Sequence, residues 1–382
     1  MLESQRALFD MPREVCYLNT AAWGPLPRQS QEAGCRGVAR KGQPWTLDPH
    51  LPGEQFARAR KAAAALIGAE PDDIALISSV SYGVATAAKI LKVPPRSRVL
   101  LLEDDHSSPV LEWMTRAEEA GFVLDVVRRP EDGDWTAAVL EAIARRGAPP
   151  LSLASISSVH WSDGGIVDLG RIAQSLRAAG AALIVDATHA VGAMPLDVKT
   201  LDPDFLVFPT YKWVLGPYGR AFLYIARRRQ NGVPLEQTSY GRRGVNAEQT
   251  TYLADTGFVA GARRFDMGER DHFISIEMAS IGMEMVAGWG VAAVSERLGW
   301  LTGQLAEGLG NLGAQVPEPH LRAPHILSLG FPAGMPEGLV ERLKATNVHV
   351  AGRLGRMRIS PHVYNDEEDV AAFVSTFRRL TP

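Results

Sequence analysis

Between about residues 65 and 230, short apolar runs alternate with segments of amphipathic helical periodicity. This alternation is typical of repeated strand and helix units, which form a mainly parallel sheet with helices on its faces. The sequence therefore predicts an α/β fold. The predicted strands are ALISS (75–79), RVLLLEDD (98–105), SLASISSVHW (152–161), ALIVDA (182–187), DFLVF (204–208) and RAFLYIA (220–226).

The pattern changes after about residue 265, where two long helical segments precede short strand-like runs. The helices are predicted at 274–290 and 291–313, and HILSLGF (325–331) is the clearest later strand. A smaller α+β domain is expected there. The predicted division has three parts: an N-terminal segment, 1–20, that packs on the small domain; a large domain, 21–262; and the small C-terminal domain, 263–382.

Composition excludes several classes of protein. Of the 382 residues, 46% are hydrophobic and 22% charged, and the net charge is −3, so neither disorder nor strong attraction to nucleic acid or membranes is expected. Cys16 and Cys35 are too few for a disulfide scaffold and lack zinc-site spacing. The first fifteen residues lack the apolar stretch of a signal peptide, so we expect a cytoplasmic protein.

The most informative segment is VDATHAVGAMPLDV…DFLVFPTYKWVLGPYG (185–219). Asp186 ends a predicted buried strand, and Lys212 follows 26 positions later, between a strand and glycines. Open α/β sheets bind ligands at this edge. Alone, Asp186 could be a turn residue and Lys212 a loop lysine. Together they match the needs of a pyridine cofactor that acts as an electron sink: a carboxylate for the ring nitrogen and an amine for a Schiff base.

These two motifs resemble the cofactor core of the class V aminotransferases, fold-type I pyridoxal-phosphate enzymes that include the cysteine desulfurases. The resemblance runs from YLNTAAWGPLP (17–27) to RISPHVYNDEED (358–369). It implies a central sheet of the seven-stranded type with helices on both faces. It also implies pyridoxal 5'-phosphate as cofactor, and a homodimer with composite active sites.

The resemblance assigns roles around the cofactor ring. Lys212 would form the Schiff base, Asp186 would contact the pyridinium nitrogen, and His189 would donate to the ring hydroxyl. DDHSSPVLEW (104–113) aligns His106 with the histidine that stacks on the ring and could shuttle protons. Without the family pattern, His189 would more often be a core histidine, and His106 could be a surface residue at a helix start.

A second group of residues is implied for the cofactor phosphate. SSVSYGVATAA (78–88) follows a strand and opens a helix, where unpaired N–H groups and the helix dipole favour an anion. This implicates Val80, Ser81 and Tyr82, although a serine N-cap alone would look similar. Tyr211 stands where relatives often carry His. In RRFDMGER (263–270), Glu269 replaces the family's threonine, so Arg270 is the better candidate for the partner's phosphate.

Substrate recognition centres on Arg358, because a planar guanidinium suits an α-carboxylate and the family's carboxylate-binding arginine has the Arg-x-Ser…Tyr-Asn context found here. An amino-acid substrate follows. Trp23 and Trp161 are expected to shape the pocket. In VHWSDGG (159–165), His160 could line it too, and Ser162 and Asp163 replace the family's Ser-Asn pair.

The predicted activity is transamination, with β-elimination by a C–S lyase or amino-acid epimerisation as alternatives, since all begin from the same cofactor adduct. Desulfuration is disfavoured because the C-terminal half has no cysteine thiol. A non-catalytic binding protein of this fold is less favoured, because the family's site residues are present together. No dinucleotide, P-loop or HExxH-type pattern occurs, and we expect no metal.

Overall fold

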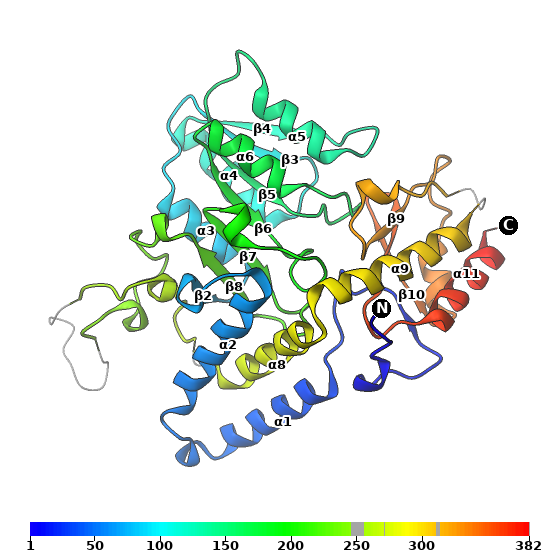
Figure 1. The fold of residues 1–382 in the computed structure, drawn as a ribbon, viewed down its shortest axis with the longest axis horizontal. Coiled ribbons are helices and arrows are strands. Elements are labelled where there is room, and N and C mark those ends of the chain that lie inside the picture. Colours follow the sequence, from blue (N-terminus) through cyan, green and yellow to red (C-terminus); the bar gives the residue numbers. More distant parts are fainter. Residues whose placement is uncertain (246–255, 271, 311–313, 382) are drawn as a thin grey trace.

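The computed structural model describes residues 1–245, 256–270, 272–310 and 314–381. Its centre is a seven-stranded sheet in the order β2-β8-β7-β6-β5-β3-β4 (Figure 1). Only β8 runs antiparallel to its neighbours, so the predicted mainly parallel sheet is confirmed. The strands are β2 (Ile74–Ile77), β3 (Arg98–Leu102), β4 (Val123–Val127), β5 (Leu151–Ser157), β6 (Ala182–Asp186), β7 (Phe205–Pro209) and β8 (Ala221–Ile225).

All six predicted strands of this sheet form, most of them shorter than expected. The run predicted as 98–105 ends at Leu102, because the chain turns through Asp104 in a left-handed conformation (φ 55°). Strand β4 was not predicted. It is an edge strand with exposed Val123 and Val126, and its mixed side chains give only a weak strand pattern.

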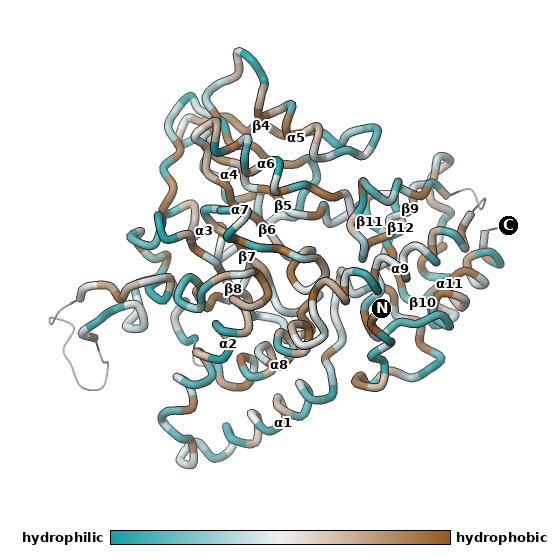
Figure 2. Tube along the Cα trace, in the orientation of Figure 1, coloured by the Kyte–Doolittle hydropathy of each residue, from teal (hydrophilic) through white to brown (hydrophobic). Residues whose placement is uncertain are grey.

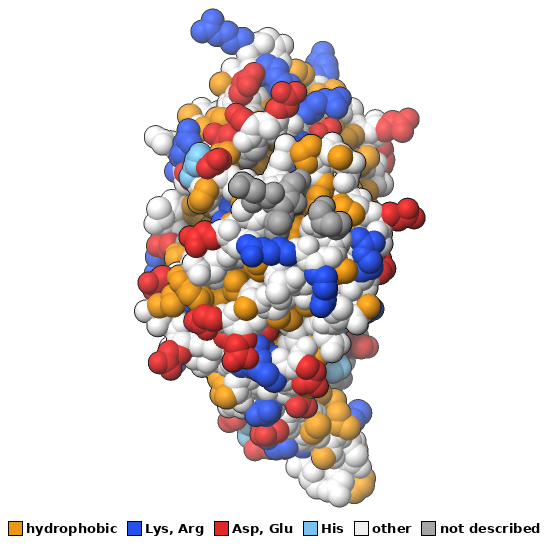
Figure 3. All heavy atoms as spheres, turned by 90° about the vertical axis from the view of Figure 1, so that its right-hand side faces the viewer, with side chains coloured by type: hydrophobic (Ala, Val, Ile, Leu, Met, Phe, Trp, Pro, Cys, Tyr) orange, Lys and Arg blue, Asp and Glu red, His pale blue; other side chains and the backbone are white. Residues whose placement is uncertain are grey.

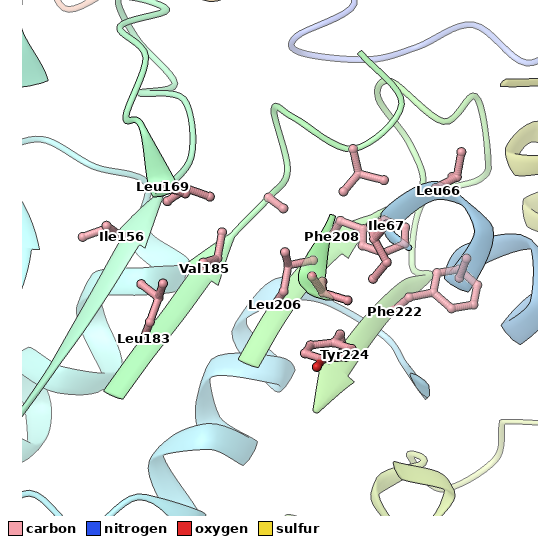
Figure 4. Packing of buried hydrophobic residues seen from close by; sticks show 14 of the residues in the cluster. Leu66, Ile67, Ile156, Leu169, Leu183, Val185, Leu206, Phe208, Phe222 and Tyr224 are labelled. Atoms are coloured by element: carbon pink, nitrogen blue, oxygen red, sulfur yellow. The ribbon is translucent and has the colours of Figure 1, made fainter. Parts of the chain in front are cut away.

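Helices cover both faces of the sheet, as predicted. One face packs against α2, α5, α6 and α8, and the other against α3 and α4. Figure 4 shows the first interface, where Phe208 and Phe222 lie beside Ile67 of α2. The strands are brown in Figure 2, in keeping with their burial. The bounds are α1 (Arg28–Gly42), α2 (Leu51–Ile67), α3 (Val80–Ile90), α4 (Ser107–Ala120), α5 (Trp135–Ala144), α6 (Leu169–Ala178), α7 (Val198–Leu201) and α8 (Phe273–Trp289).

The C-terminal part has its own core around a three-stranded antiparallel sheet in the order β11-β12-β9. The N-terminal segment joins this part, because β1 (Cys16–Tyr17) pairs in parallel with β10. In addition, Arg6 and Arg13 form ion pairs with Asp369. The other elements are α9 (Val291–Leu309), β9 (Leu327–Leu329), α10 (Leu339–Lys344), β10 (Val348–His349), β11 (Ala351–Arg353), β12 (Arg356–Ile359) and α11 (Glu367–Leu380).

The contacts of helix α8 indicate where the large domain ends. It contacts α1 and α2, and Ile276 and Met283 belong to the core beneath the central sheet. The chain then bends by 80° between α8 and α9, at Gly290 (φ 81°). We therefore propose that the division between the domains lies at Gly290 rather than at residue 263. Among the described residues, no single helix is long and apolar enough to span a membrane; α8 and α9 meet that test only when joined across the bend.

Short 3₁₀ helices complete the fold, and the surface of the C-terminal side carries charges of both signs. Figure 3 shows basic and acidic side chains interspersed on that face. The 3₁₀ helices are Arg6–Leu8, Pro44–Thr46, Pro71–Asp73, Arg227–Arg229, Ser239–Gly241, Ala262–Phe265 and Pro319–Leu321.

Candidate active site

A cavity of about 260 Å³ lies at the carboxyl ends of the central strands. Ser157, Asp186 and Pro209 are the last residues of β5, β6 and β7, and all three line it. The edge position agrees with the predicted ligand site. The other lining residues are Ser78, Ser79, Val80, Ser81, His106, Ser107, Ser108, Trp161, Thr188, His189, Tyr211, Lys212, Tyr218, Gly219 and Arg220.

A larger cavity of about 940 Å³ lies among α2, α6 and α8. Its wall is mostly apolar, with Leu66, Leu169 and Ala287 among its residues. It contains none of the residues predicted for catalysis or cofactor binding. The smaller cavity is therefore the candidate active site, since it unites an amine, a carboxylate and imidazoles.

Lys212 and His189 meet at the floor of the smaller cavity. The Lys212 Nζ lies 3.2 Å from His189 Nε2, and both side chains are buried. On the other side of the imidazole, the indole N–H of Trp213 donates to His189 Nδ1 across 3.1 Å. His325 Nε2 lies 2.6 Å from the His189 carbonyl oxygen, which can only accept, so His325 donates. The lysine thus contacts a buried network that is built from three separate loops of the chain.

Burial makes the charged form of the Lys212 amine unfavourable. Desolvation, with a further contribution from the positive charge of Arg358, lowers the pKa of Lys212 to about 7, although Asp186 acts in the opposite direction. Desolvation, followed by the charge of Lys212, also holds the pKa of His189 well below its ordinary value. A large fraction of the Lys212 amine is consequently uncharged near neutral pH, as a nucleophile or a base requires.

Asp186 presents a carboxylate to the same cavity. Its Oδ1 accepts the backbone N–H of Thr188 at 2.9 Å, and its side chain is almost fully buried. Among the described residues, its Oδ2 has no hydrogen-bond donor. A carboxylate oxygen that lines a cavity and has no donor suits a protonated ring nitrogen. This is the first feature that fits a pyridine cofactor.

His106 lies at the opposite side of the cavity, where α4 begins. Its ring meets Trp161 edge to face, with 6.0 Å between the centroids. Asp105 fixes the turn, because its carboxylate accepts the His106 backbone N–H at 2.7 Å and the Ser157 hydroxyl at 2.7 Å. Desolvation raises the pKa of Asp105 to about 6 and lowers the pKa of His106. His106 therefore remains neutral over more of the pH range.

The N-terminus of α3 forms a second end of the cavity. Ser79 caps the helix, and its Oγ accepts the Tyr82 N–H at 3.1 Å. Among the described residues, the backbone N–H groups of Val80 and Ser81 have no acceptor. Buried Arg220 lines the same end and donates to Ser275 at 2.7 Å. Free N–H groups at a helix N-terminus beside a guanidinium suit a phosphate, the second feature that fits the cofactor.

Arg358 is buried behind Trp161. Its Nη1 donates to the Trp161 carbonyl at 2.5 Å, whereas its Nε has no partner among the described residues. Desolvation, aided by the charge of Arg353, lowers the pKa of Arg358 to about 9. An incompletely bonded, buried guanidinium behind the cavity wall is suited to a carboxylate ligand.

Several predicted residues lie outside the wall of this cavity. The Tyr82 side chain hydrogen-bonds with Glu236. Trp23 is 57% exposed and stacks on Tyr218, with 5.0 Å between the ring centroids. Arg270 pairs with Asp266. Within this chain, these three residues do not line the predicted pocket.

The loop 159–165 also differs from its predicted role. His160 is fully buried, stacks on Trp135 at 4.7 Å and donates to the Glu103 carbonyl at 3.0 Å. Asp163 accepts the Trp135 indole N–H at 3.2 Å and pairs with Arg129. The suggestion that His160 lines the pocket is wrong, because these contacts commit it to the core. Only Trp161 of this loop lines the cavity.

Thr188, Tyr218 and Arg220 line the cavity but were not predicted from sequence. Thr188 and Tyr218 lie within the quoted motifs but carry no distinctive pattern of their own. Arg220 had a visible signal, because it is the charged first residue of the apolar run RAFLYIA. A buried charge at the end of a strand indicates a bound partner or ligand.

Comparison with known proteins agrees with this site. The family model of the class-V aminotransferases matches residues 51–373. The uncharacterized aminotransferase YcbU of Bacillus subtilis is 27% identical over 324 residues, 83% of this chain and 81% of that protein. Isopenicillin N epimerase of Streptomyces clavuligerus is 29% identical over 273 residues, 70% and 68% of the two chains. The apo structure of a cysteine desulfurase from Thermococcus onnurineus NA1 superposes with a TM-score of 0.84 at 20% identity, covering 100% and 99%.

The family-model match, together with the fold and the amine–carboxylate cavity, defines an enzyme of the pyridoxal-phosphate-dependent fold type I. The chain belongs to the class-V aminotransferase family, whose model covers most of its length. Members of this family depend on pyridoxal phosphate, and their activities include transamination and C–S cleavage.

Proposed function

We propose that this protein binds pyridoxal 5'-phosphate in the 260 Å³ cavity and acts at the Cα of an amino acid, with transamination as its reaction. The observation that carries the proposal is the pairing of Lys212, whose pKa is lowered to about 7, with Asp186 in one cavity. The bound cofactor would supply the electron sink that stabilises negative charge at Cα.

The residues present fit that cofactor at each end. Lys212 would attach it, the Asp186 carboxylate would keep the ring nitrogen protonated, and His189 would donate to the ring hydroxyl. The N–H groups of Val80 and Ser81 would bind the phosphate, and Arg220 of the same chain would add a positive charge. Tyr211, whose ring lies 4.3 Å from that of Tyr218, would close this end.

The chain's own groups then account for the substrate steps. Arg358 would orient the α-carboxylate, and His106 would stack on the ring of the bound cofactor. The Lys212 amine would take the proton from Cα. Trp161 would cover the substrate from solvent, because it lies between His106 and Arg358.

Transamination is preferred to desulfuration because neither cysteine supplies a mobile thiol. Cys35 is on α1, and Cys16 is buried, where desolvation raises the pKa of its thiol far above the ordinary value. The segment 345–360, which follows α10, contains no cysteine. The similarity to an isopenicillin N epimerase makes epimerisation the second candidate.

The decisive experiment incubates the cofactor-loaded protein with single L-amino acids and follows three products. A 2-oxo acid with stoichiometric pyridoxamine phosphate supports transamination. Pyruvate and ammonia without pyridoxamine phosphate would replace it with β-elimination. Deuterium exchange at Cα with loss of optical rotation would replace it with epimerisation. Lys212→Ala should abolish all three reactions, whereas the surface variant Lys199→Ala should not.

We further propose a cytoplasmic homodimer in which Arg270 contacts the cofactor phosphate of the partner subunit. RRFDMGER aligns with the family segment that reaches the partner's phosphate, Glu269 replaces the threonine of that segment, and the adjacent Arg270 lies outside the cavity of its own chain. Mixing inactive Lys212→Ala with Arg270→Ala should restore part of the activity, because one hybrid site would have both residues intact. No recovery between two folded, exchanging variants would contradict shared sites.

A further inference from the structure

Three arginines lie on one face of the hairpin formed by β11 and β12. Arg353 pairs with Arg356 across the antiparallel ladder, and Ala351 pairs with Arg358. Because paired residues project to the same side of a sheet and alternate residues share a side, Arg353, Arg356 and Arg358 all belong to one face. The intervening Met357 and Ile359 enter the core of the C-terminal domain.

No acidic side chain among the described residues forms an ion pair with this arginine face. Arg358 donates to the Trp161 carbonyl, Arg356 donates to the hydroxyl and carbonyl oxygens of Ser328, and Arg353 donates to the Gly352 carbonyl. Each donates only to uncharged oxygens. The carboxylate of Asp163, which pairs with Arg129, offsets part of the charge of Arg356, whereas Arg353 and Arg358 form no ion pair among the described residues. Like charges on one face destabilise a sheet, so Arg353 and Arg358 favour an anionic ligand.

The arginine face is directed to the active site. Ser328 pairs with Arg358 and donates from its hydroxyl to the Ser162 carbonyl, next to cavity residue Trp161. Arg353 lines a second cavity of about 490 Å³ together with Tyr17 and Asn19. The Asn19 Oδ1 is buried there without a partner among the described residues.

Electrostatic effects support the same placement. The positive charges of Arg358 and Arg353 both contribute to lowering the pKa of Lys212, after the larger effect of desolvation. Arg353 therefore acts on the reacting amine from the second cavity. Arg356 is held by two bonds to Ser328, which leaves Arg353 as the arginine free to meet a second anion.

We propose that the substrate is an amino acid with an anionic side chain, in which Arg358 binds the α-carboxylate and Arg353 binds the side-chain anion. The proposal rests on the proposed function, which by itself requires only one carboxylate site. The side-chain group is a carboxylate or a sulfur oxyanion, because a guanidinium binds both with paired N–H donors.

The first test measures binding without chemistry. The cofactor-loaded protein is titrated with succinate and glutarate, and with the monocarboxylates butyrate and pentanoate as chain-length controls. The dicarboxylates lack an amino group and cannot react. We expect them to bind at least about tenfold more tightly than the monocarboxylates, and Arg353→Gln to remove that difference. Arg342→Gln, on α10, is the matched control and should keep it.

The second test measures turnover of aspartate, glutamate and cysteate against asparagine and glutamine. The wild type should favour the anionic substrates, and Arg353→Gln should lower kcat/KM for them about tenfold or more without a matching loss for the amides. Arg353→Lys keeps the positive charge and should retain part of the preference for anionic substrates. It replaces Arg353→Gln in the comparison if the glutamine variant is unstable. Aspartate or glutamate should dominate if the group is a carboxylate, and cysteate if it is a sulfur oxyanion.

The outcomes separate the two proposals. Turnover of neutral amino acids with equal binding of mono- and dicarboxylates overturns the assignment of Arg353 and leaves the proposed function intact. Dicarboxylate binding that depends on Arg353, without turnover of any amino acid, supports the anion site and contradicts the proposed function.

Discussion

The indole N–H of Trp213 donates to Nδ1 of His189, and this single bond determines which nitrogen of the imidazole carries its proton. An indole nitrogen can only donate, so Nδ1 must be the acceptor. The neutral imidazole therefore carries its hydrogen on Nε2, which faces Lys212 at 3.2 Å. Trp213 is itself held between His325 and His362, with ring centroids 4.3 Å and 5.8 Å away.

Trp213→Phe should keep most of this packing and remove the donor. A buried hydrogen bond contributes ~1 kcal/mol, so we expect about a fivefold shift of the His189 tautomer ratio toward Nδ1–H. Two-bond nitrogen–proton correlation spectra of ¹⁵N-histidine-labelled protein report the ratio directly. Trp135→Phe is the control, since its indole bonds to Asp163 and not to His189. An unchanged spectrum in Trp213→Phe would show that another contact sets the tautomer.

Lys212→Met should stabilise the cofactor-free protein at neutral pH. With a folded pKa of about 7 against 10.5, the folded state binds fewer protons than the unfolded chain between those values. The destabilisation by Lys212 is therefore complete below pH 7 and disappears as the pH rises toward 10.5. At ~1.4 kcal/mol per pKa unit, the variant should gain a few kcal/mol at pH 7 and progressively less up to pH 10. Urea unfolding of both proteins at several pH values measures the difference in their free energy of unfolding. A difference that does not change with pH would contradict a Lys212 pKa of about 7.

Ser157→Ala should raise the pKa of Asp105 above its present value of about 6. The Ser157 hydroxyl donates to the carboxylate at 2.7 Å and favours the charged form. Loss of a hydrogen bond of ~1 kcal/mol corresponds to a rise of roughly one pKa unit. Carboxyl ¹³C titration gives the value. A fall in the pKa would mean that the hydroxyl does not stabilise the carboxylate.

Gly24→Ala should disturb the backbone of the reactive lysine. An added Cβ at Gly24 would lie 2.1 Å from the Lys212 carbonyl oxygen, and the Gly24 N–H donates to the Tyr211 carbonyl at 2.8 Å. Neither backbone segment can move away without losing other contacts, so we expect a loss of stability of ~2 kcal/mol or more. Gly42→Ala, at the end of α1 with no heavy atom within 4 Å of the added Cβ, should be neutral or stabilising. Thermal unfolding of both variants tests the contrast.

Much of the fold and part of the site could be predicted from sequence. The strands of the central sheet are apolar runs bounded by clear turns, and the order of Asp186, His189 and Lys212 was enough to place them together. The edge strand β4 was missed because it is half exposed. Helices α1 and α2 precede the region where the alternating pattern begins.

The errors within the site have a common origin. A motif gives a residue's position along the chain but not the direction of its side chain. His160 lies in the core, where it stacks on Trp135, and Trp23 stacks on Tyr218 at the surface. Conversely, Arg220 reaches the cavity from the position just before β8, in an apolar run that matches none of the family motifs quoted above.

The N-terminal segment mechanically couples the C-terminal domain to the reactive lysine. Leu18 and Thr20 donate their backbone N–H groups to the carbonyls of His349 and Ser360, and Gly24 does the same to Tyr211, the neighbour of Lys212. Between Thr20 and Gly24 there are only three residues, too few to absorb a large displacement as slack. A rotation of the C-terminal domain would therefore pull on the peptide beside Lys212.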